Sequence, residues 1–172
     1  SRTACVAVLR DGNLMASGST DADERSAAAL APLVSSTVAK AQVRLQDVGL
    51  IAVTIGPGSF TGLRVGVTTA KTLAYALKCY VLGIDTLELI ARQAPVDVQS
   101  LWAVLDAQRQ QLFAARFERG EGAELRLVSP TAIVDAEAFV ARLAPDEHVS
   151  GPGVSRIRDR LPGKAQILPE EM

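Results

Sequence analysis

The sequence is poor in the residues that proteins use to bind nucleic acids tightly. Aromatic side chains make up 4% of its 172 residues, and its 18 Lys and Arg are balanced by 19 Asp and Glu, for a formal net charge of −1. Bases stack on aromatic rings, and basic side chains neutralise phosphates. Neither composition nor charge therefore gives a reason to expect strong nucleic-acid binding by this chain alone.

Residues that carry catalysis are also scarce. His148 is the single histidine, and a lone histidine beside a strand is more often a surface or edge residue than a catalytic one. No serine stands in the G-x-S-x-G pattern of hydrolases. Asp85, Asp97 and Asp106 are interpreted as capping or turn residues, because their spacing gives no reason to pair them. We therefore predict no catalytic residue and no metal site.

The chain has two cysteines and no long apolar run. Cys5 and Cys79 lie apart in apolar surroundings, so we expect buried, reduced thiols of a cytosolic protein. No uncharged apolar stretch reaches the roughly 18 residues of a membrane span, and there is no signal-peptide pattern. We expect a cytoplasmic location without membrane contact.

The order of elements is mostly strand then helix, which predicts a mixed α/β fold. Asp11-Gly12 is a strong hairpin signal between strands at 4–9 and 14–18. The other strands are expected at 50–55, 80–84, 101–105, 111–117, 124–128 and 149–150, with a turn at 120–122. Helices are expected at 26–43 (kinked by Pro32 or starting there), 61–77, 86–93, 135–143 and 154–160. Because residues 94–100 contain Pro95, they are the predicted boundary between domains 1–97 and 98–172.

A glycine loop joins the strand at 50–55 to the helix at 61–77. Its residues are Gly56, Pro57, Gly58, Ser59, Phe60, Thr61 and Gly62. Glycine on either side of proline permits φ > 0 in a tight turn, and Thr61 is the expected helix cap, with Ser59 as the alternative. Free N–H groups there would suit a phosphate. However, Leu63 and Arg64 stand where a P-loop needs Lys and Ser or Thr, and Thr61 stands where the dinucleotide fingerprint needs glycine.

The helix at 61–77 carries few charges for a surface helix. At about 100° per residue, its core stripe is Leu63, Val67, Ala70, Ala74 and Leu77. A second stripe holds the small residues Gly62, Gly66, Thr69 and Ala76, and a third holds the uncharged Thr61, Val65, Thr68, Thr72 and Tyr75. Arg64, Lys71 and Lys78 fall on one line. Periodicity leaves open whether the uncharged stripes pack inside one domain or against a partner.

Several segments resemble the TsaB (YeaZ) family, non-catalytic partners in bacterial synthesis of threonylcarbamoyl-adenosine on tRNA. GPGSFTGLRVG at 56–66 is the most specific. Three further segments also match the family. Its first hairpin matches TACVAVLRDG at 3–12, its strand-to-helix passage matches VLGIDTLELIA at 81–91, and its strand–turn–strand matches LDAQRQQLFAARF at 105–117.

The resemblance implies the actin-like ATPase (ASKHA) fold with two ribonuclease-H-like lobes. Family members normally have a strand before the segment matching Ser1 and a helix after LPEEM at 168–172, so the resemblance implies that both are truncated here. The first strand supplies phosphate-facing residues. We therefore expect this chain alone to bind no cofactor, and ATP or ADP at an interface with TsaD stays open.

The resemblance also implies partners. These are TsaD, a metal-bearing enzyme of the same fold, and the ATPase TsaE in the larger complex, with a homodimer in isolation and tRNA reached only through the complex. It favours a partner surface on the helices at 61–77 and 26–43, the latter with Lys40 as its one ionised residue. That surface comprises Leu30, Val34, Thr37, Val38, Thr61, Gly62, Val65, Gly66, Thr68, Thr69 and Thr72.

Three functions remain after these considerations. The favoured one is a scaffold or activating subunit without chemistry of its own. A glycoprotease-like hydrolase would need the paired histidines of the TsaD metal site, which one histidine cannot supply. An actin-fold kinase or ATPase would need the phosphate strand and a second phosphate loop with an acidic residue.

For the isolated chain we expect weak, salt-sensitive tRNA binding and no clear calorimetric signal with ATP. The near-neutral charge leaves few cations to release counterions from phosphates. Titration of tRNA at low and at physiological salt, beside ATP calorimetry, measures both. Tight tRNA binding that resists salt would contradict the first expectation, and a clear heat of ATP binding the second.

Overall fold

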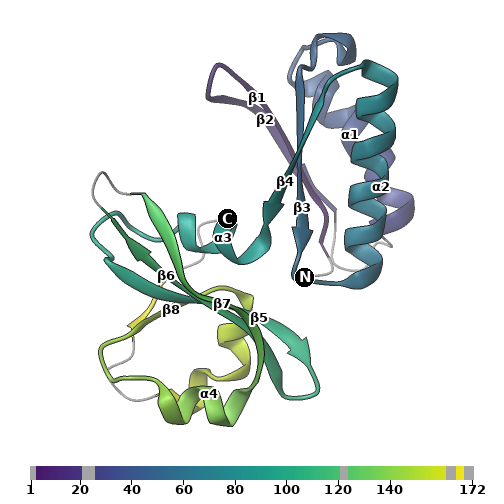
Figure 1. Ribbon diagram of the computed structural model, residues 1–172. Helices are drawn as coiled ribbons and strands as arrows, with labels where there is room; N and C mark the ends of the chain where they lie inside the picture. The colour runs from purple at the N-terminus through teal and green to yellow at the C-terminus, as the bar shows by residue number, and fades with distance from the viewer. Residues whose placement is uncertain (1–2, 21–25, 121–123, 162–165, 169–172) are drawn as a thin grey trace. The chain divides into compact units, whose positions relative to one another are not determined.

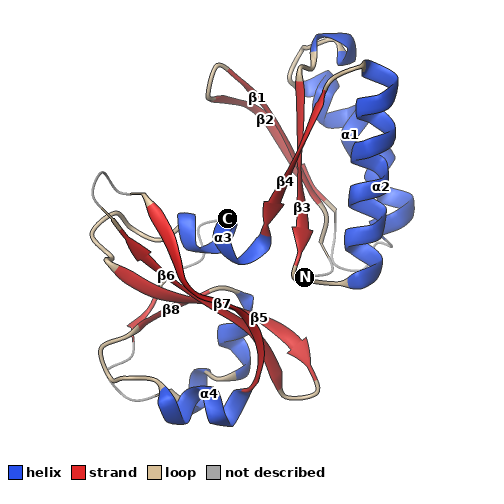
Figure 2. Ribbon diagram, viewed as in Figure 1, coloured by secondary structure: helices blue, strands red, loops and turns tan. Residues whose placement is uncertain are grey.

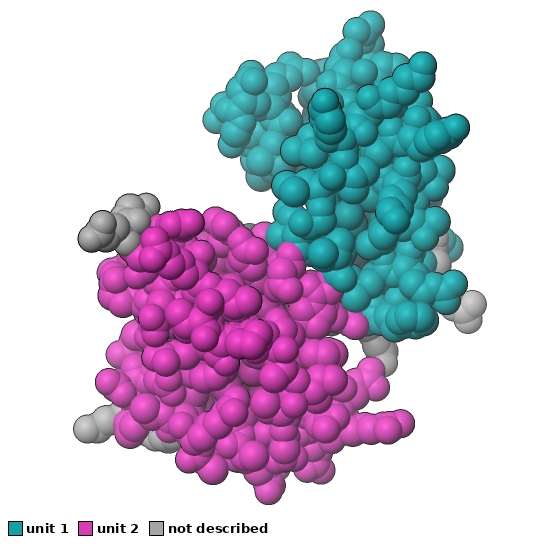
Figure 3. All heavy atoms as spheres, in the orientation of Figure 1, with its two compact units in different colours: residues 1–55, 59–84 teal, residues 56–58, 85–172 magenta. Residues whose placement is uncertain are grey.

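The computed structural model describes residues 3–20, 26–120, 124–161 and 166–168. Two compact units divide the chain (Figure 3): unit 1 spans residues 1–55 and 59–84, and unit 2 spans residues 56–58 and 85–172. Both units contain helices and strands (Figures 1 and 2). The predicted mixed α/β class is confirmed.

Unit 1 begins with the predicted hairpin. Strands β1 (Cys5–Arg10) and β2 (Asn13–Ser19) pair antiparallel. Asp11 and Gly12 have φ of 51° and 78°, as the two central residues of a type I′ turn require. The Asp-Gly signal was therefore sufficient to place this turn.

Two helices and a second pair of strands complete unit 1. They are α1 (Ser26–Lys40), the 3₁₀ turn η1 (Leu45–Asp47), β3 (Leu50–Gly56), α2 (Phe60–Leu77) and β4 (Tyr80–Asp85). Strands β3 and β4 form a two-stranded sheet separate from β1–β2. Helices α1 and α2 contact each other and lie on the same side of the strands (Figure 1). Pro32 lies inside α1, so the helix does not begin at this proline.

Unit 2 contains a five-stranded sheet in the order β7-β6-β5-β8-β9. Strands β5 (Ser100–Gln108), β6 (Gln111–Arg119) and β7 (Leu125–Asp135) form an antiparallel meander. Strand β8 (His148–Ser150) runs parallel to β5, and β9 (Gln166–Ile167) runs parallel to β8. Strand β7 extends well past the predicted 124–128. Most of the predicted turn at 120–122, and residues 169–172, lie outside the described residues.

Helices cover both faces of this sheet. Helix α3 (Thr86–Arg92) packs in a cluster with Leu101, Ala103 and Leu105 of β5. Further along the chain come helix α4 (Ala136–Arg142) and the 3₁₀ turns η3 (Pro152–Arg156) and η4 (Arg158–Arg160). Residues of α4 and η3 pack with Val104 of β5 in a second cluster. Alternate residues of β5 therefore enter two cores, which explains its continuous apolar sequence.

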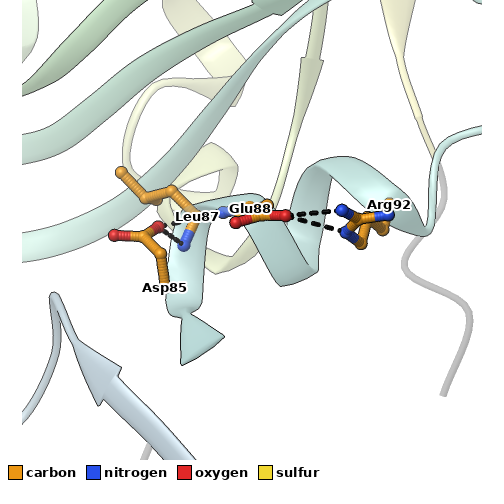
Figure 4. A network of polar contacts seen from close by, with 4 residues as sticks. All are labelled: Asp85, Leu87, Glu88 and Arg92. Atoms are coloured by element: carbon orange, nitrogen blue, oxygen red, sulfur yellow. Dashed lines mark hydrogen bonds and ion pairs between the residues drawn. The ribbon is translucent and has the colours of Figure 1, made fainter. Parts of the chain in front are cut away.

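Aspartates cap the two short helices α3 and α4 of unit 2, and the predicted capping role of Asp85 is confirmed. The Asp85 carboxylate accepts hydrogen bonds from the N–H groups of Leu87 (2.8 Å) and Glu88 (3.0 Å), and Glu88 accepts two from Arg92 (Figure 4). Asp135 caps α4 in the same way through Glu137 and Ala138. Each cap satisfies N–H groups that have no partner within the helix.

The division between units lies earlier in the chain than the boundary predicted between residues 97 and 98. The Arg119 guanidinium of β6 donates to the carbonyl oxygens of Ala94 (2.8 Å), Val98 (3.1 Å) and Pro95 (3.3 Å). Leu87 of α3 is fully buried in the core of unit 2. Helix α3 and the proline segment therefore belong to the unit that follows them.

Gly151→Ala should destabilise unit 2 by about 3 kcal/mol or more. Gly151 has φ of 109°, and an added Cβ would lie 2.4 Å from the Val104 carbonyl oxygen of β5. Gly120→Ala is the matched control: among the described residues, the atoms nearest to its added Cβ belong to the movable Arg126 side chain, the first at 3.1 Å, and the substitution should cost less than about 1 kcal/mol. Urea unfolding followed by Trp102 fluorescence measures both. Equal effects would show that β8 does not need this close approach to β5.

Candidate partner surface

The glycine loop ends β3 and begins α2. Gly56 has φ of 123° and precedes a cis peptide bond to Pro57. The Ser59 hydroxyl oxygen accepts a hydrogen bond from the Gly62 N–H at 3.3 Å, and its carbonyl oxygen accepts one from Leu63 at 2.8 Å. Ser59 is therefore the cap of α2, and the preferred prediction of Thr61 is wrong, because Thr61 already lies in the first helical turn. Gly58 does not adopt positive φ, so only one glycine beside the proline uses that freedom.

The predicted core stripe of α2 faces the interior of unit 1. Ala70 and Ala74 are buried at 3% and 5% exposure, and Leu63, Val67 and Leu77 are half-buried. Gly66 faces the same way, since a Cβ added to it would lie 3.7 Å from Val53 of β3. Gly66 therefore lets α2 approach its own sheet. It is half-buried, and its place on a partner surface stays a prediction.

The uncharged stripe of α2 is exposed. Thr61, Thr68 and Thr72 are exposed, Val65 is half-buried, and Tyr75 is 89% exposed. Gly62 and Thr69 are half-buried beside it. This face can bind another surface by burial rather than by ion pairing.

On α1, the structure separates the predicted residues. Leu30, Val34 and Val38 are half-buried, but Thr37 is 1% exposed and faces the strands. Its hydroxyl donates to the Leu33 carbonyl oxygen at 2.7 Å, and a Cβ added to Gly18 of β2 would lie 3.1 Å from it. Thr37 is therefore part of the interior of unit 1, not of a partner surface. Helical periodicity placed it wrongly because a threonine can satisfy its hydroxyl on its own helix.

Two aromatic residues belong to the exposed face although the predicted surface omitted them. Phe60 is 73% exposed, and the Arg64 guanidinium lies over its ring at 5.4 Å from the centroid. Tyr75 stands on the exposed stripe of α2. In the sequence, Phe60 and Tyr75 each stand among small and hydroxyl-bearing residues, and this pattern could have indicated that they belong to the surface. We call this set (Phe60, Thr61, Val65, Thr68, Thr72 and Tyr75, with Leu30, Val34 and Val38) the α1–α2 surface.

The titratable candidates occupy structural positions. His148 begins β8, an inner strand between β5 and β9. Asp106 accepts hydrogen bonds from the Gln108 N–H and from Arg156, both at 2.8 Å. Partial burial raises the pKa of Asp106, but these bonds outweigh it and hold the pKa below its usual range. Asp97 lies in the turn before β5.

The cysteines differ from their prediction in burial. Both are free, but Cys5 is exposed and Cys79 is half-buried. Within the described ranges no three His, Cys, Asp or Glu side chains gather as a metal site would need. Among the described helices, none combines the length and the hydropathy of a membrane span.

Ser59→Ala should lower the stability of unit 1 by about 1 kcal/mol, because a Gly62 N–H loses its cap. Thr61→Ala is the matched control, since the exposed Thr61 caps nothing and should change stability by less than about 0.5 kcal/mol. Thermal unfolding followed by circular dichroism at 222 nm compares the two. A larger loss for Thr61→Ala would restore Thr61 as the cap.

The sequence is similar to that of proteins of tRNA threonylcarbamoyladenosine synthesis. The family model described as "TsaD: tRNA N6-adenosine threonylcarbamoyltransferase" matches residues 20–151. A Bacillus subtilis protein named tRNA threonylcarbamoyladenosine biosynthesis protein TsaB is 31% identical over 117 residues, which are 68% of this chain and 51% of that protein. The Escherichia coli protein of the same name is 31% identical over 92 residues, 52% of this chain and 40% of that protein. The chain thus spans about half the length of the curated relatives it matches.

Solved structures show the same fold. YeaZ from Pseudomonas aeruginosa superposes with a TM-score of 0.79 at 26% identity, over 99% of this chain and 80% of that one. A structure described as an uncharacterized protein with similarity to peptidase YEAZ, from the same organism, gives 0.81 at 25% identity over the same shares. The predicted actin-like (ASKHA) fold is confirmed. Because the family model covers most of the chain, and TsaB and YeaZ proteins share its sequence and fold, this chain belongs to the TsaD family and, within it, to the TsaB (YeaZ) group.

Proposed function

We propose that this chain is a non-catalytic scaffold or activating subunit in the formation of threonylcarbamoyl-adenosine on tRNA, and that it binds a TsaD protein. The observation that carries the proposal is the α1–α2 surface, whose members carry no charge and whose aromatic and threonine members on α2 are exposed. The TsaB relatives are named for this biosynthesis, which supports the same pathway for this chain.

The composition of the α1–α2 surface suits a protein partner. Phe60 and Tyr75 are exposed at 73% and 89%, and aromatic side chains of this kind dominate the binding energy of interfaces. Threonines between them add methyl groups and short hydroxyls that lose little conformational freedom when covered. Helix α2 contains no acidic residue. Arg64, whose guanidinium lies over the Phe60 ring at 5.4 Å from the centroid, and Lys71 are the basic residues of α2, so a partner that covers Phe60 also meets positive charge.

The family relationship supports a like-folded partner. The TsaD model matches this chain itself, so a TsaD protein has elements equivalent to α1 and α2 that can pack against them. Two helices from each chain would form a four-helix contact. In isolation the same patch can pair with a second copy about a two-fold axis, giving a homodimer.

Because this chain is proposed to have no chemistry of its own, the catalytic metal and tRNA binding are assigned to its partners and to the complex. TsaD supplies the catalytic metal, TsaE joins the larger complex, and tRNA is bound through the complex in the cytoplasm. This chain alone is proposed to bind no cofactor, and an interface with TsaD is the place where ATP or ADP could bind.

Val65→Glu should weaken association with TsaD by about 2–5 kcal/mol, because the interface would bury an unpaired carboxylate. Thr68→Glu tests the same face at an exposed position and should act in the same direction without disturbing the fold. Sedimentation velocity with and without TsaD measures association, and the melting temperature reports folding.

Thr131→Glu is the matched control for these two substitutions. Thr131 is exposed on β7 in unit 2, so the added charge should leave association unchanged. If Thr68→Glu associates like the parent, the interface lies elsewhere. If Val65→Glu unfolds while Thr68→Glu does not, Val65 supports the core. The association of Thr68→Glu with TsaD then tests the interface by itself.

A further inference from the structure

We infer that the turn between β5 and β6 is a contact for the phosphate backbone of RNA, made by the Arg109 guanidinium with the Gln108 and Gln110 amides beside it. The inference rests on the backbone conformation of this turn and on the charge around it. It deepens the function proposed above and rests on it, because it names a place where the assembled complex holds its tRNA.

The turn has a backbone conformation that its residues disfavour. Gln108 pairs with Gln111, so Arg109 and Gln110 are the two central residues of the hairpin formed by β5 and β6 (Figure 1). Gln108, Arg109 and Gln110 have φ of 64°, 49° and 62°. Side chains of L-residues crowd the backbone at positive φ; glycine tolerates it freely, and asparagine and aspartate are enriched there. None of these three residue types stands in the turn.

The β1–β2 hairpin meets the same demand with favourable residues. Its two central residues, Asp11 and Gly12, have φ of 51° and 78°, and Asp-Gly is a preferred pair for such a turn. Residues other than glycine persist at positive φ where the surrounding structure holds them, and they gather at binding sites. The contrast between the two hairpins indicates that the β5–β6 turn keeps its long side chains for a purpose other than folding.

Contacts from neighbouring segments hold the turn in place. The Gln108 N–H donates to the Asp106 carboxylate at 2.8 Å, and the same carboxylate accepts a hydrogen bond from Arg156 of η3 at 2.8 Å. On the other side, the Gln110 carbonyl oxygen accepts from the Ala136 N–H at the start of α4, at 2.9 Å. The backbone of the turn is thus fixed before any ligand arrives, and a ligand does not bear the cost of ordering it.

The side chains of the turn are exposed donors. Gln108, Arg109 and Gln110 are all exposed, and none of their side chains has a hydrogen bond or ion pair within the part of the chain that the structure describes. A guanidinium presents five N–H donors in a planar fork, and each glutamine amide presents two more. Such a fork binds a phosphate through two parallel hydrogen bonds.

Acidic residues of the adjoining segments do not cancel the charge of the turn. The Asp106 carboxylate is ion-paired with Arg156 at 2.7 Å, and Glu137 of α4 is ion-paired with Arg160 at 3.2 Å. Asp135 uses its carboxylate on the N–H groups that begin α4. Over the described residues, the guanidinium of the turn therefore has no acidic partner, and it attracts an anion.

RNA is the anion that the side-chain chemistry and the proposed function favour together. Arginine and glutamine side chains both make hydrogen bonds to the phosphates of nucleic acids. The 2′-hydroxyl of RNA is a donor and an acceptor, as is an amide. The turn belongs to unit 2, whereas the surface proposed for the protein partner belongs to unit 1. One guanidinium supplies one phosphate contact, which agrees with weak tRNA binding by the chain alone.

Arg109→Gln in the complex with TsaD and TsaE tests the inference. Fluorescence anisotropy with labelled tRNA, between about 50 and 200 mM salt, measures affinity and its salt dependence. The substitution should weaken binding about tenfold at the lower salt. It should also make the slope of log affinity against log salt shallower by about 0.7–0.9, because one phosphate contact is lost.

Two further variants serve as controls for this measurement. Arg109→Lys keeps the charge and should keep the salt slope of the parent. Arg92→Gln is the matched control, because Arg92 is exposed in the same unit but already paired with Glu88 at 2.6 Å. Its loss should leave tRNA affinity and salt slope unchanged.

Substitutions that relieve the backbone test the argument from conformation. Arg109→Asn combined with Gln110→Gly places the preferred Asn-Gly pair in the turn. It should raise the melting temperature followed by Trp102 fluorescence by about 3 °C or more, and weaken tRNA binding as Arg109→Gln does. Gln110→Gly alone should raise the melting temperature and keep the salt slope. A melting temperature that does not rise in either variant would overturn the inference.

The remaining outcomes separate this inference from the proposed function. If the chain forms no complex with TsaD, the proposed function fails and this inference falls with it. If the complex forms and Arg109→Gln binds tRNA with the affinity and slope of the parent, the inference alone fails. If Arg109→Gln instead weakens association with TsaD in the absence of tRNA, the turn binds a carboxylate of a protein, and the RNA contact is wrong.

Discussion

Unit 2 depends on strand β5, which is hydrogen-bonded on both edges and buried on both faces. It pairs antiparallel with β6 on one edge and parallel with β8 on the other. Leu101, Ala103 and Leu105 enter the core beneath α3, while Val104 enters the core beneath α4. Because successive side chains of a strand point to opposite faces, one apolar run can support both helices.

The segments around β5 are arranged to approach it closely. Gly151 and Gly153 lie against the backbone of Val104 and Leu105, where any Cβ would come within 2.9 Å of a backbone atom or nearer. Arg119 holds the segment before β5 through three carbonyl oxygens. The 3₁₀ turns after β8 and the proline segment after α3 are therefore fixed by contacts to one strand and its neighbour, and unit 2 has no free linker in this region.

Unit 1 uses small residues for a different purpose. Gly66, Ala70 and Ala74 let α2 lie close to β3 and its neighbours, which leaves threonines and aromatics on the outer face. Close packing by small side chains buries little apolar area per residue. The same composition leaves an outer stripe of α2 whose members carry no charge.

The sequence alone determined the elements whose signals are local. Asp11-Gly12 placed its turn because those residues tolerate the left-handed region, and Asp85 and Asp135 placed two helix starts because a carboxylate beside free N–H groups needs no distant partner. The GPGSFTGLRVG segment identified the family. Tertiary structure decided the rest. The β5–β6 turn passes through Gln108, Arg109 and Gln110 with φ of 64°, 49° and 62°, although no glycine marks it, because the strands on either side impose it. Thr37 faces inward, because helical periodicity gives the faces of a helix but not which face its own sheet will cover. Arg119 of β6 ties the proline segment to unit 2 through bonds between residues far apart in the sequence, which no local signal indicates.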